Sequence, residues 1–275
     1  MPVSNASQEP RFGFGDNWRR FLDVLDDDRI AVAEDSLKSM LGEESLAGKT
    51  VVDIGSGSGL FSLAAMRLGA ERVHSFDYDS SSVNCARELK RRYFPDDVRW
   101  TIERGDVLDS TYLDSLGDWD IIYSWGVLHH TGDLWKALSN VANMARPGSK
   151  ALISIYNDQG GQSRRWTRVK QMYNTGPAGR VAVLGIFVPS FAALELAIDV
   201  LRARNPLDTY REYYRTRGMS RVHDWVDWLG GYPFEVAKPE QVFTLFRDRG
   251  FVLEKLKTCG GGIGCNEFLF RRGSE

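Results

Sequence analysis

The sequence is poor in cysteine and nearly balanced in charge. Its 275 residues include three cysteines, Cys85, Cys259 and Cys265, without a Cys-x-x-Cys pair, so neither a disulfide framework nor a structural zinc site is expected and no metal site is predicted. The formal net charge of -2 provides no large basic field, which disfavours binding to a long nucleic-acid backbone. Residues 1–11 lack the positive cluster and apolar run of a secretory signal. A cytoplasmic protein is therefore predicted.

The chain does contain one concentrated motif, within residues 50–77. Residues 50–54 are rich in β-branched side chains and lead into a loop with three alternating glycines, Gly55, Gly57 and Gly59. After a helix's length of chain, a second apolar stretch ends in the carboxylate of Asp77. A strand, a glycine loop, a helix and a second strand that ends in an acid form the front half of a nucleoside-binding βαβ unit.

The spacing within the loop indicates which kind of nucleoside is bound. A dinucleotide fingerprint has glycines at its first, third and sixth positions, whereas the sixth position here is Leu60. Asp53, just before the loop, would repel a phosphate but attract an ammonium group. A cationic, phosphate-free nucleoside is therefore predicted. Two alternatives stay open: a dehydrogenase, because Asp77 could hold an NAD ribose, and a purely structural glycine turn.

Residues 45–155 resemble the class I S-adenosylmethionine-dependent methyltransferases, in particular the small-molecule enzymes of the ubiquinone-biosynthesis type. The resemblance implies that S-adenosylmethionine is the cofactor, that Asp77 holds its ribose, that Tyr78 lies against adenine and that Asp106 faces the adenine amino group. The cofactor residues that it implies are Asp53, Gly55, Ser56, Gly57, Gly59, Asp77, Tyr78, Gly105, Asp106, Val107 and Ser124. Trp18, in an aromatic segment, either helps to close this pocket or attaches the first helix to the core.

Strand-like and helix-like segments alternate from residue 50 to residue 155, which predicts a doubly wound parallel sheet covered by helices on both faces. The resemblance implies a seven-stranded, mostly parallel sheet whose antiparallel last strand lies between strands five and six. Residues 1–48 are predicted to form an N-terminal helical cap. The methyltransferase core should comprise residues 49–155 and 238–275, and residues 156–237 should form a helical lid inserted between strands five and six.

The composition of the predicted lid bears on the substrate. Residues 181–201 are apolar, but Pro189 is expected to split them into a packed helical hairpin, with each half too short to span a bilayer. Shallow membrane contact by a lid that receives a lipid-linked substrate is the alternative. The arginines of residues 202–221 would suit a phosphorylated or lipid-pyrophosphate acceptor, although such a run also fits a solvated helix face.

Two histidines follow the predicted fourth strand, where an acceptor would meet the methyl donor. Methyl transfer to an amine or a hydroxyl requires the removal of a proton, and imidazole has a suitable pKa for this task. His130 is predicted to act as the base or to orient the acceptor, with a hydrogen-bonded loop histidine as the alternative, and His129 is the second candidate. Tyr156, Asn157 and Asp158, which follow the fifth strand, are predicted to contact the substrate.

The acceptor is predicted to be a small molecule that is methylated on oxygen or nitrogen. Residues 124–127 lack the Asp/Asn-Pro-Pro-aromatic motif of base-modifying amino-methyltransferases with this fold, and they contain no nucleophilic cysteine. Two rival hypotheses stay open, namely tRNA modification through the basic lid and a catalytically inactive cofactor-binding partner protein.

Overall fold

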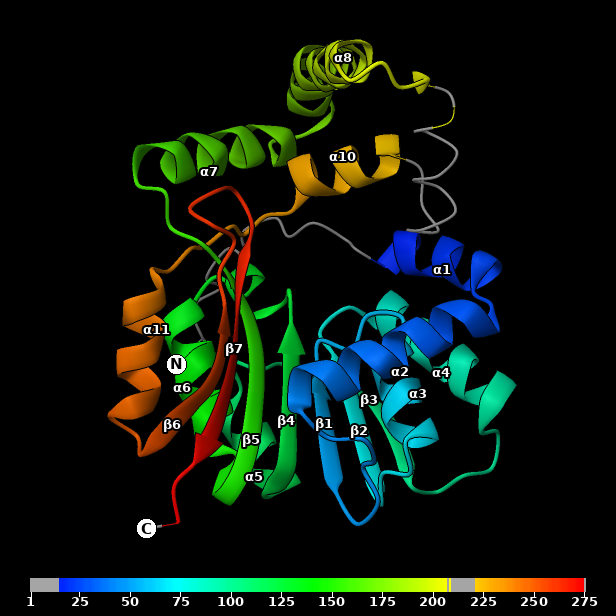
Figure 1. Ribbon diagram of the computed structural model, residues 1–275, viewed down its shortest axis with the longest axis vertical. Helices are drawn as coiled ribbons and strands as arrows, with labels where there is room; N and C mark the ends of the chain where they lie inside the picture. The colour runs from blue at the N-terminus through cyan, green and yellow to red at the C-terminus, as the bar shows by residue number, and fades with distance from the viewer. Residues whose placement is uncertain (1–14, 207, 209–220, 275) are drawn as a thin grey trace, which may run out of the picture. The chain divides into compact units, whose positions relative to one another are not determined.

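The computed structural model of the chain describes residues 15–206, 208 and 221–274, and it divides into two compact units (Figure 1). Of the described residues, those of 15–163 and 235–274 form the sheet unit, and those between 164 and 234 form the helical unit. The predicted lid, residues 156–237, therefore contains the larger segment of the helical unit. The helices that were expected to form an N-terminal cap belong to the sheet unit.

The elements of the sheet unit are, in chain order, α1 (Gly15–Val24), α2 (Asp27–Leu41), β1 (Thr50–Ile54), α3 (Leu60–Arg67), β2 (Arg72–Asp77), α4 (Ser80–Tyr93), β3 (Trp100–Arg104), α5 (Ser110–Leu116), β4 (Trp119–Trp125), η1 (Leu128–His130), α6 (Leu134–Asn143), β5 (Ala145–Tyr156), α11 (Pro239–Arg247), β6 (Phe251–Lys257) and β7 (Cys265–Arg272). The helical unit contains most of α7 (Gly161–Asn174), together with α8 (Pro177–Leu201) and α10 (Arg221–Gly230). Aspartates begin several of the helices: the side chains of Asp26 and Asp79 accept hydrogen bonds from the first-turn N–H groups of α2 and α4.

The seven strands lie in the order β3-β2-β1-β4-β5-β7-β6, with β7 antiparallel to both of its neighbours and the other pairs parallel (Figure 1). This order confirms the predicted doubly wound sheet and the place of its last strand. Val51 of β1 pairs with Val73 of β2 on one side and with Ile121 of β4 on the other, so the strand order reverses at β1. In open sheets of this kind, ligands bind beyond the carboxyl ends of the strands at that switch point.

Successive apolar residues of the central strands face opposite sides of the sheet. Val51 and Ile121 belong to a buried cluster that includes side chains of α2, α3 and α4. Val52 and Ile122 belong to a second buried cluster, which includes side chains of α5, α6 and α11. Because both faces are covered, these strands are continuous apolar runs rather than alternating ones.

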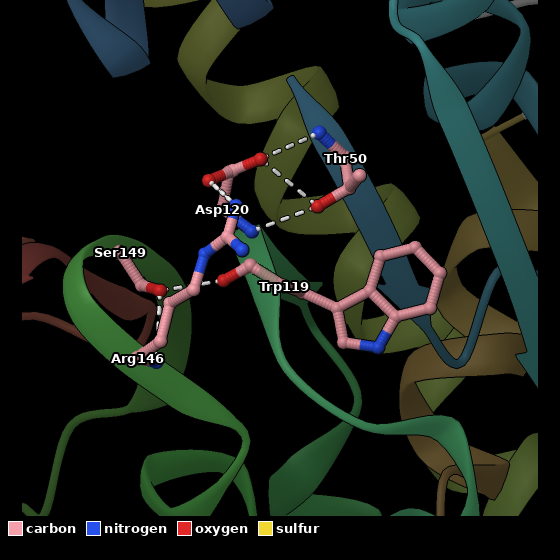
Figure 2. Close-up of polar contacts among 5 residues, drawn as sticks. All are labelled: Thr50, Trp119, Asp120, Arg146 and Ser149. Carbon is pink, nitrogen blue, oxygen red and sulfur yellow. Dashed lines mark hydrogen bonds and ion pairs between the residues drawn. The ribbon is translucent and has the colours of Figure 1, made fainter. Parts of the chain in front are cut away.

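Polar contacts join the amino ends of β1, β4 and β5 (Figure 2). One carboxylate oxygen of Asp120 accepts hydrogen bonds from the backbone N–H of Thr50 (2.9 Å) and from its hydroxyl (3.0 Å). Arg146 forms an ion pair with the other oxygen, and Ser149 donates to the carbonyl of Trp119 at 2.5 Å. These contacts hold β4 between its neighbours at the end of the sheet opposite the glycine loop.

The apolar segment of the helical unit differs from the prediction. Pro189 lies inside a single helix of 25 residues, α8, so the expected division into a hairpin is wrong. Pro189 has no N–H to donate to the carbonyl of Gly185, four residues earlier. Because Gly185 is exposed, solvent can satisfy this carbonyl, and the helix continues past the proline. By length and composition alone, α8 could cross a membrane, which also corrects the expectation that the segment is too short.

Candidate functional site

The glycine loop after β1 closely approaches two other segments of the sheet unit. Gly57 has a φ of +54°, and a Cβ atom at this position would lie 2.9 Å from the Trp18 indole of α1. Gly55 has a φ of +72°, and its Cβ would lie 2.3 Å from a methyl group of Val127, which follows β4. A positive φ and a close contact together exclude a side chain at both positions. The loop is therefore packed between α1 and the segment that carries the two histidines.

Trp18 contacts the glycine loop and packs against the core, and its part in closing a cofactor pocket stays a prediction. Besides its contact with Gly57, its ring packs edge-on against Phe21 of the same helix, with ring centroids 6.3 Å apart. Trp18 thus lies against the glycine loop and is anchored to the core at the same time.

Asp77, at the carboxyl end of β2, is oriented by two backbone N–H groups. One carboxylate oxygen accepts a hydrogen bond from Gly57 (3.0 Å) and the other accepts from Asp79 (2.9 Å). Burial raises the pKa of Asp77 to about 6, against the opposing effect of these hydrogen bonds. A carboxylate has about four acceptor sites, so the fixed side chain of Asp77 can still accept a hydrogen bond from a ligand hydroxyl.

Asp53 is buried at the end of β1 in a hydrogen-bond chain. The hydroxyl of Ser62 donates to its carboxylate at 2.5 Å, the hydroxyl of Ser75 lies 2.6 Å from that of Ser62, and the Trp100 indole N–H donates to Ser75 at 2.7 Å. Burial, together with a smaller effect of the nearby charge of Asp77, raises the pKa of Asp53 to about 7. No local pattern indicates these three partners, because each belongs to a different element and only the fold brings them together.

The segment after β3 is attached to β2. The backbone N–H of Gly105 donates to the carbonyl of Asp77 at 3.1 Å, which places Asp106 in the segment next to that acid. One carboxylate oxygen of Asp106 accepts the N–H of Leu108 at 2.9 Å, and Val107 is buried in the core. This fixed turn brings the predicted adenine-facing residue to the same edge of the sheet.

The other predicted cofactor residues have different environments. The Tyr78 ring is partly exposed and lies 5.3 Å from the Arg104 guanidinium group. Gly59 immediately precedes α3. Ser124 is fully buried, and its hydroxyl donates to the carbonyl of Ile54 at 3.2 Å, so that side chain joins β4 to β1.

The side chains of this region fit S-adenosylmethionine. The two acids, Asp53 and Asp77, suit a cation and would repel a phosphate. The Ser56 hydroxyl is buried in the loop, and none of the described residues supplies it with a hydrogen-bond partner. A polar ligand could supply the hydrogen-bond partner that this buried hydroxyl lacks.

The two histidines of η1 differ in burial. His129 is buried, its Nδ1 accepts the backbone N–H of Tyr156 at 3.3 Å, and its ring centroid lies 4.1 Å from that of Tyr156. This bond places the proton of the neutral ring on Nε2. His130 is half-buried, with its ring edge-on to Tyr156 at 5.7 Å. Of the two imidazoles, His130 is therefore the more accessible.

Glu235, which was not among the predicted site residues, holds the segment that carries these histidines. Its carboxylate accepts the N–H groups of Gly132 (3.0 Å) and Leu134 (3.1 Å) at the start of α6, and its own N–H donates to the carbonyl of His129 (2.9 Å). A negative charge at a helix N-terminus is stabilising. Glu235 lies 103 residues beyond Gly132, so no local pattern could have revealed the contact.

The three predicted substrate residues lie at the carboxyl end of β5, which neighbours β4: Tyr156 is the last residue of the strand, and Asn157 and Asp158 follow it. The Asn157 side-chain oxygen accepts a hydrogen bond from Asn266 (3.1 Å), and the Asp158 carboxylate accepts the N–H of Gly160 (2.7 Å). Burial raises the pKa of Tyr156 above its usual range. In the described part of the chain, no group of three or more His, Cys, Asp or Glu side chains could hold a metal ion.

A seven-stranded sheet in this order, with an acid-flanked glycine loop at the switch point, defines a class I methyltransferase fold. A family model described as a methyltransferase domain matches residues 25–182, more than half of the chain. The chain therefore belongs to the methyltransferase domain family. Its membership confirms the class predicted from the sequence, the class I S-adenosylmethionine-dependent methyltransferases.

Solved structures of similar fold agree with this family. Magnesium protoporphyrin IX methyltransferase (ChlM) from Synechocystis PCC 6803, with bound SAH, has a TM-score of 0.56 and 15% identity, covering 94% of this chain and 94% of that chain. The N-methyltransferase NodS from Bradyrhizobium japonicum WM9, in complex with S-adenosyl-L-homocysteine, has a TM-score of 0.52 and 16% identity, covering 95% of this chain and 99% of that chain. At these identities the likeness shows the fold alone.

One similarity in sequence is local. The ribosomal protein L11 methyltransferase of Alteromonas mediterranea is 53% identical over 47 residues, which are 17% of this chain and 16% of that relative. The match spans about a sixth of the relative's length. It therefore says nothing about a shared acceptor.

Proposed function

We propose that this protein transfers the methyl group of S-adenosylmethionine to an oxygen or nitrogen of a small molecule, with His130 as the base. The contact between Gly55 and Val127 carries the proposal, because it joins the cofactor loop to the segment that holds His130. Two solved structures of the same fold were crystallised with SAH, the demethylated form of the cofactor. A small acceptor is supported by the sequence after β4, which lacks the motif of nucleic-acid amino-methyltransferases.

Residues of the sheet unit would bind different parts of the cofactor. Asp77 would accept hydrogen bonds from the ribose hydroxyls, and Asp106 would accept one from the adenine amino group. Asp53 would supply negative charge to a cationic ligand. When bound, S-adenosylmethionine supplies a methyl group on a positively charged sulfur. Trp18, packed against Gly57, would help to keep water from the loop.

His130 would remove the proton from the acceptor at an imidazole nitrogen. An imidazole has a pKa near neutrality, so that it can take a proton from an amine or hydroxyl as that group attacks. The buried His129 and the carboxylate of Glu235 would hold the segment in place, since both are bonded to its backbone or to β5. Tyr156, Asn157 and Asp158 would contact the acceptor from the neighbouring strand.

Cell extract incubated with the protein and isotope-labelled S-adenosylmethionine, followed by mass spectrometry, tests the proposal. A labelled small molecule that forms only with the active protein is expected. Labelled tRNA, together with RNA binding that weakens steeply with salt, would instead favour the tRNA hypothesis. Cofactor binding without any labelled product would favour the inactive partner protein, and a labelled protein would point to a polypeptide acceptor.

A further inference from the structure

Helix α8 has an apolar outer face that none of the described residues covers. Within its most apolar window of 18 residues the mean hydropathy is 2.2, yet only 6% of that window is buried. The large exposed side chains of this face are Val181, Ile186, Leu194, Leu196, Ile198, Val200 and Leu201. The core helix of a soluble protein with such a composition would be mostly buried, so the exposed face of α8 is suited to an apolar partner.

The two acids of α8 are turned away from this face. Asp199 is buried and Glu195 is half-buried. Both lie on the inner stripe that recurs every four residues through Val183, Phe187 and Phe191. As a result, the outer face has no charged side chain between residues 181 and 201.

The inner stripe is packed against aromatic side chains of the same unit. The Phe187 ring lies 5.3 Å from that of Trp166 in α7, and the Phe191 ring lies 6.1 Å from that of Trp228 in α10. The aromatic residues of α8 are therefore directed inward, while the large side chains of the outer face are all aliphatic. Ser190, a hydroxyl on the outer side, already donates to the carbonyl of Ile186 at 2.6 Å.

This composition favours lipid over protein as the partner of the face. The centres of protein interfaces are enriched in aromatic side chains and arginine, and they carry directional hydrogen bonds. Between residues 181 and 201, the outer face of α8 has no exposed aromatic side chain, no arginine and no free directional donor, whereas hydrocarbon requires only aliphatic contact. Positive charges stand at both of its ends, with exposed Arg180 before it and exposed Arg202 and Arg204 after it, and guanidinium groups attract anionic headgroups.

We propose that the outer face of α8 binds the surface of an anionic lipid bilayer, with the helix lying along the interface and Arg180, Arg202 and Arg204 on the headgroups. A transmembrane span would require the inner stripe to leave Trp166 and Trp228, and it would carry Asp199 into hydrocarbon. The packed stripe therefore favours shallow insertion of one face. This inference does not depend on the methyl-transfer proposal.

Sedimentation with vesicles tests the proposal on the full-length purified chain. Vesicles of phosphatidylcholine with phosphatidylglycerol should bind the protein. The triple variant Ile186→Ser, Leu194→Ser, Val200→Ser should bind at least about tenfold more weakly, because binding scales with buried apolar area. The matched control is Ile263→Ser, Leu256→Ser, Val98→Ser, which removes the same exposed residue types from the sheet unit and should bind like the wild type.

Charge and folding need separate variants. Arg180→Gln, Arg202→Gln, Arg204→Gln should weaken binding to anionic vesicles and remove its dependence on the anionic lipid. Circular dichroism checks that each variant is folded. If the triple variant of the outer face does not fold, the single variant Leu194→Ser is used in its place. A smaller but measurable loss of binding is then expected.

Three kinds of result would overturn the proposal. The first is a wild type that does not bind vesicles, or an outer-face variant that binds them as well as the wild type does. The second is a wild-type dimer, seen by light scattering, that the outer-face variant converts to a monomer without any vesicle binding, which assigns the face to a second copy. The third is membrane-bound protein that resists extraction by alkaline carbonate, which assigns α8 to a span.

Discussion

The carboxylate of Asp77 accepts a hydrogen bond from the backbone N–H of Gly57, 3.0 Å away and 20 residues earlier in the sequence. The bond joins the end of β2 to the glycine loop after β1. It helps to fix the orientation of the acid, and a carboxylate held in this way can still accept a hydrogen bond from a ligand. The proposed cofactor site depends on this pair.

Replacement of Asp77 tests the pair directly. Asp77→Ala should weaken S-adenosylmethionine binding by about tenfold or more, or about 1.4 kcal/mol, because two hydrogen-bond acceptors and one negative charge are lost. Isothermal titration calorimetry measures the affinity, and Asp96→Ala, an exposed acid of the same unit, is the control. Unchanged affinity in Asp77→Ala would refute the pocket.

The pH dependence of cofactor binding follows from the two buried acids. The pKa of Asp77 is raised to about 6 and that of Asp53 to about 7, mainly by burial. A cationic ligand favours their ionised forms, so affinity should rise as pH rises through this range, by up to about tenfold per pH unit for each group, and binding should release protons. Calorimetry in buffers of different ionisation enthalpy measures the release. If affinity is flat between about pH 5.5 and 7.5, the acids do not interact with the ligand.

The two histidines should separate catalysis from stability. His130→Ala should lower turnover by about a hundredfold or more with little change in cofactor affinity, because it removes a general base. His129→Ala should instead lower the free energy of unfolding by about 1–3 kcal/mol, because it leaves the buried N–H of Tyr156 without its acceptor. Steady-state kinetics and urea denaturation measure the two effects. His130 is not the base if its alanine variant methylates an identified acceptor at the wild-type rate.

Asp120 should contribute stability that is lost in acid. Although burial acts against it, hydrogen bonds from Arg146 and Thr50 lower the pKa of Asp120 (Figure 2). A carboxyl with a lowered folded-state pKa stabilises the fold above its unfolded pKa, and this stability disappears as pH falls through the folded value. Asp120→Asn should cost about 1–2 kcal/mol near pH 7 and flatten the fall in stability below about pH 4. Urea denaturation from pH 3 upward measures the loss of stability and its pH dependence. If the wild type and Asp120→Asn have the same stability at every pH, Asp120 does not stabilise the fold in this way.

Lys170 should make the helical unit more stable in mild alkali. It is buried between the Trp228 and Phe234 rings and donates to the carbonyl of Trp228 near the end of α10. Burial lowers the pKa of Lys170 to about 7. Between that pH and about pH 10, Lys170 is protonated in the unfolded chain but neutral in the folded one. The free energy of unfolding should therefore rise with pH across this window.

Lys170→Met should remove that rise. The control is Lys136→Met, at an exposed lysine, which should keep the wild-type slope. Denaturation at two pH values within the window gives the slopes. If Lys170→Met and the wild type have the same pH dependence, Lys170 is not titrating in this range.

Local patterns were enough to predict the cofactor loop and the layered sheet. The alternating glycines and the acid at the end of the next strand depend on backbone geometry within a few residues, and continuous apolar strands require cover on both faces. The place of β7, by contrast, came from resemblance to a family, since nothing local determines which strands an antiparallel hairpin joins.

The sequence by itself determined the family, the loop and the acids, because these follow from short-range spacing. Only the tertiary structure decided that Ser62, Ser75 and Trp100 support Asp53, that Glu235 holds the segment with the histidines, and that His129 rather than His130 is buried. It also decided that α8 continues past Pro189 and buries its acids while exposing its aliphatic side chains. Contacts between distant elements depend on how the chain packs in three dimensions, and no local pattern encodes them.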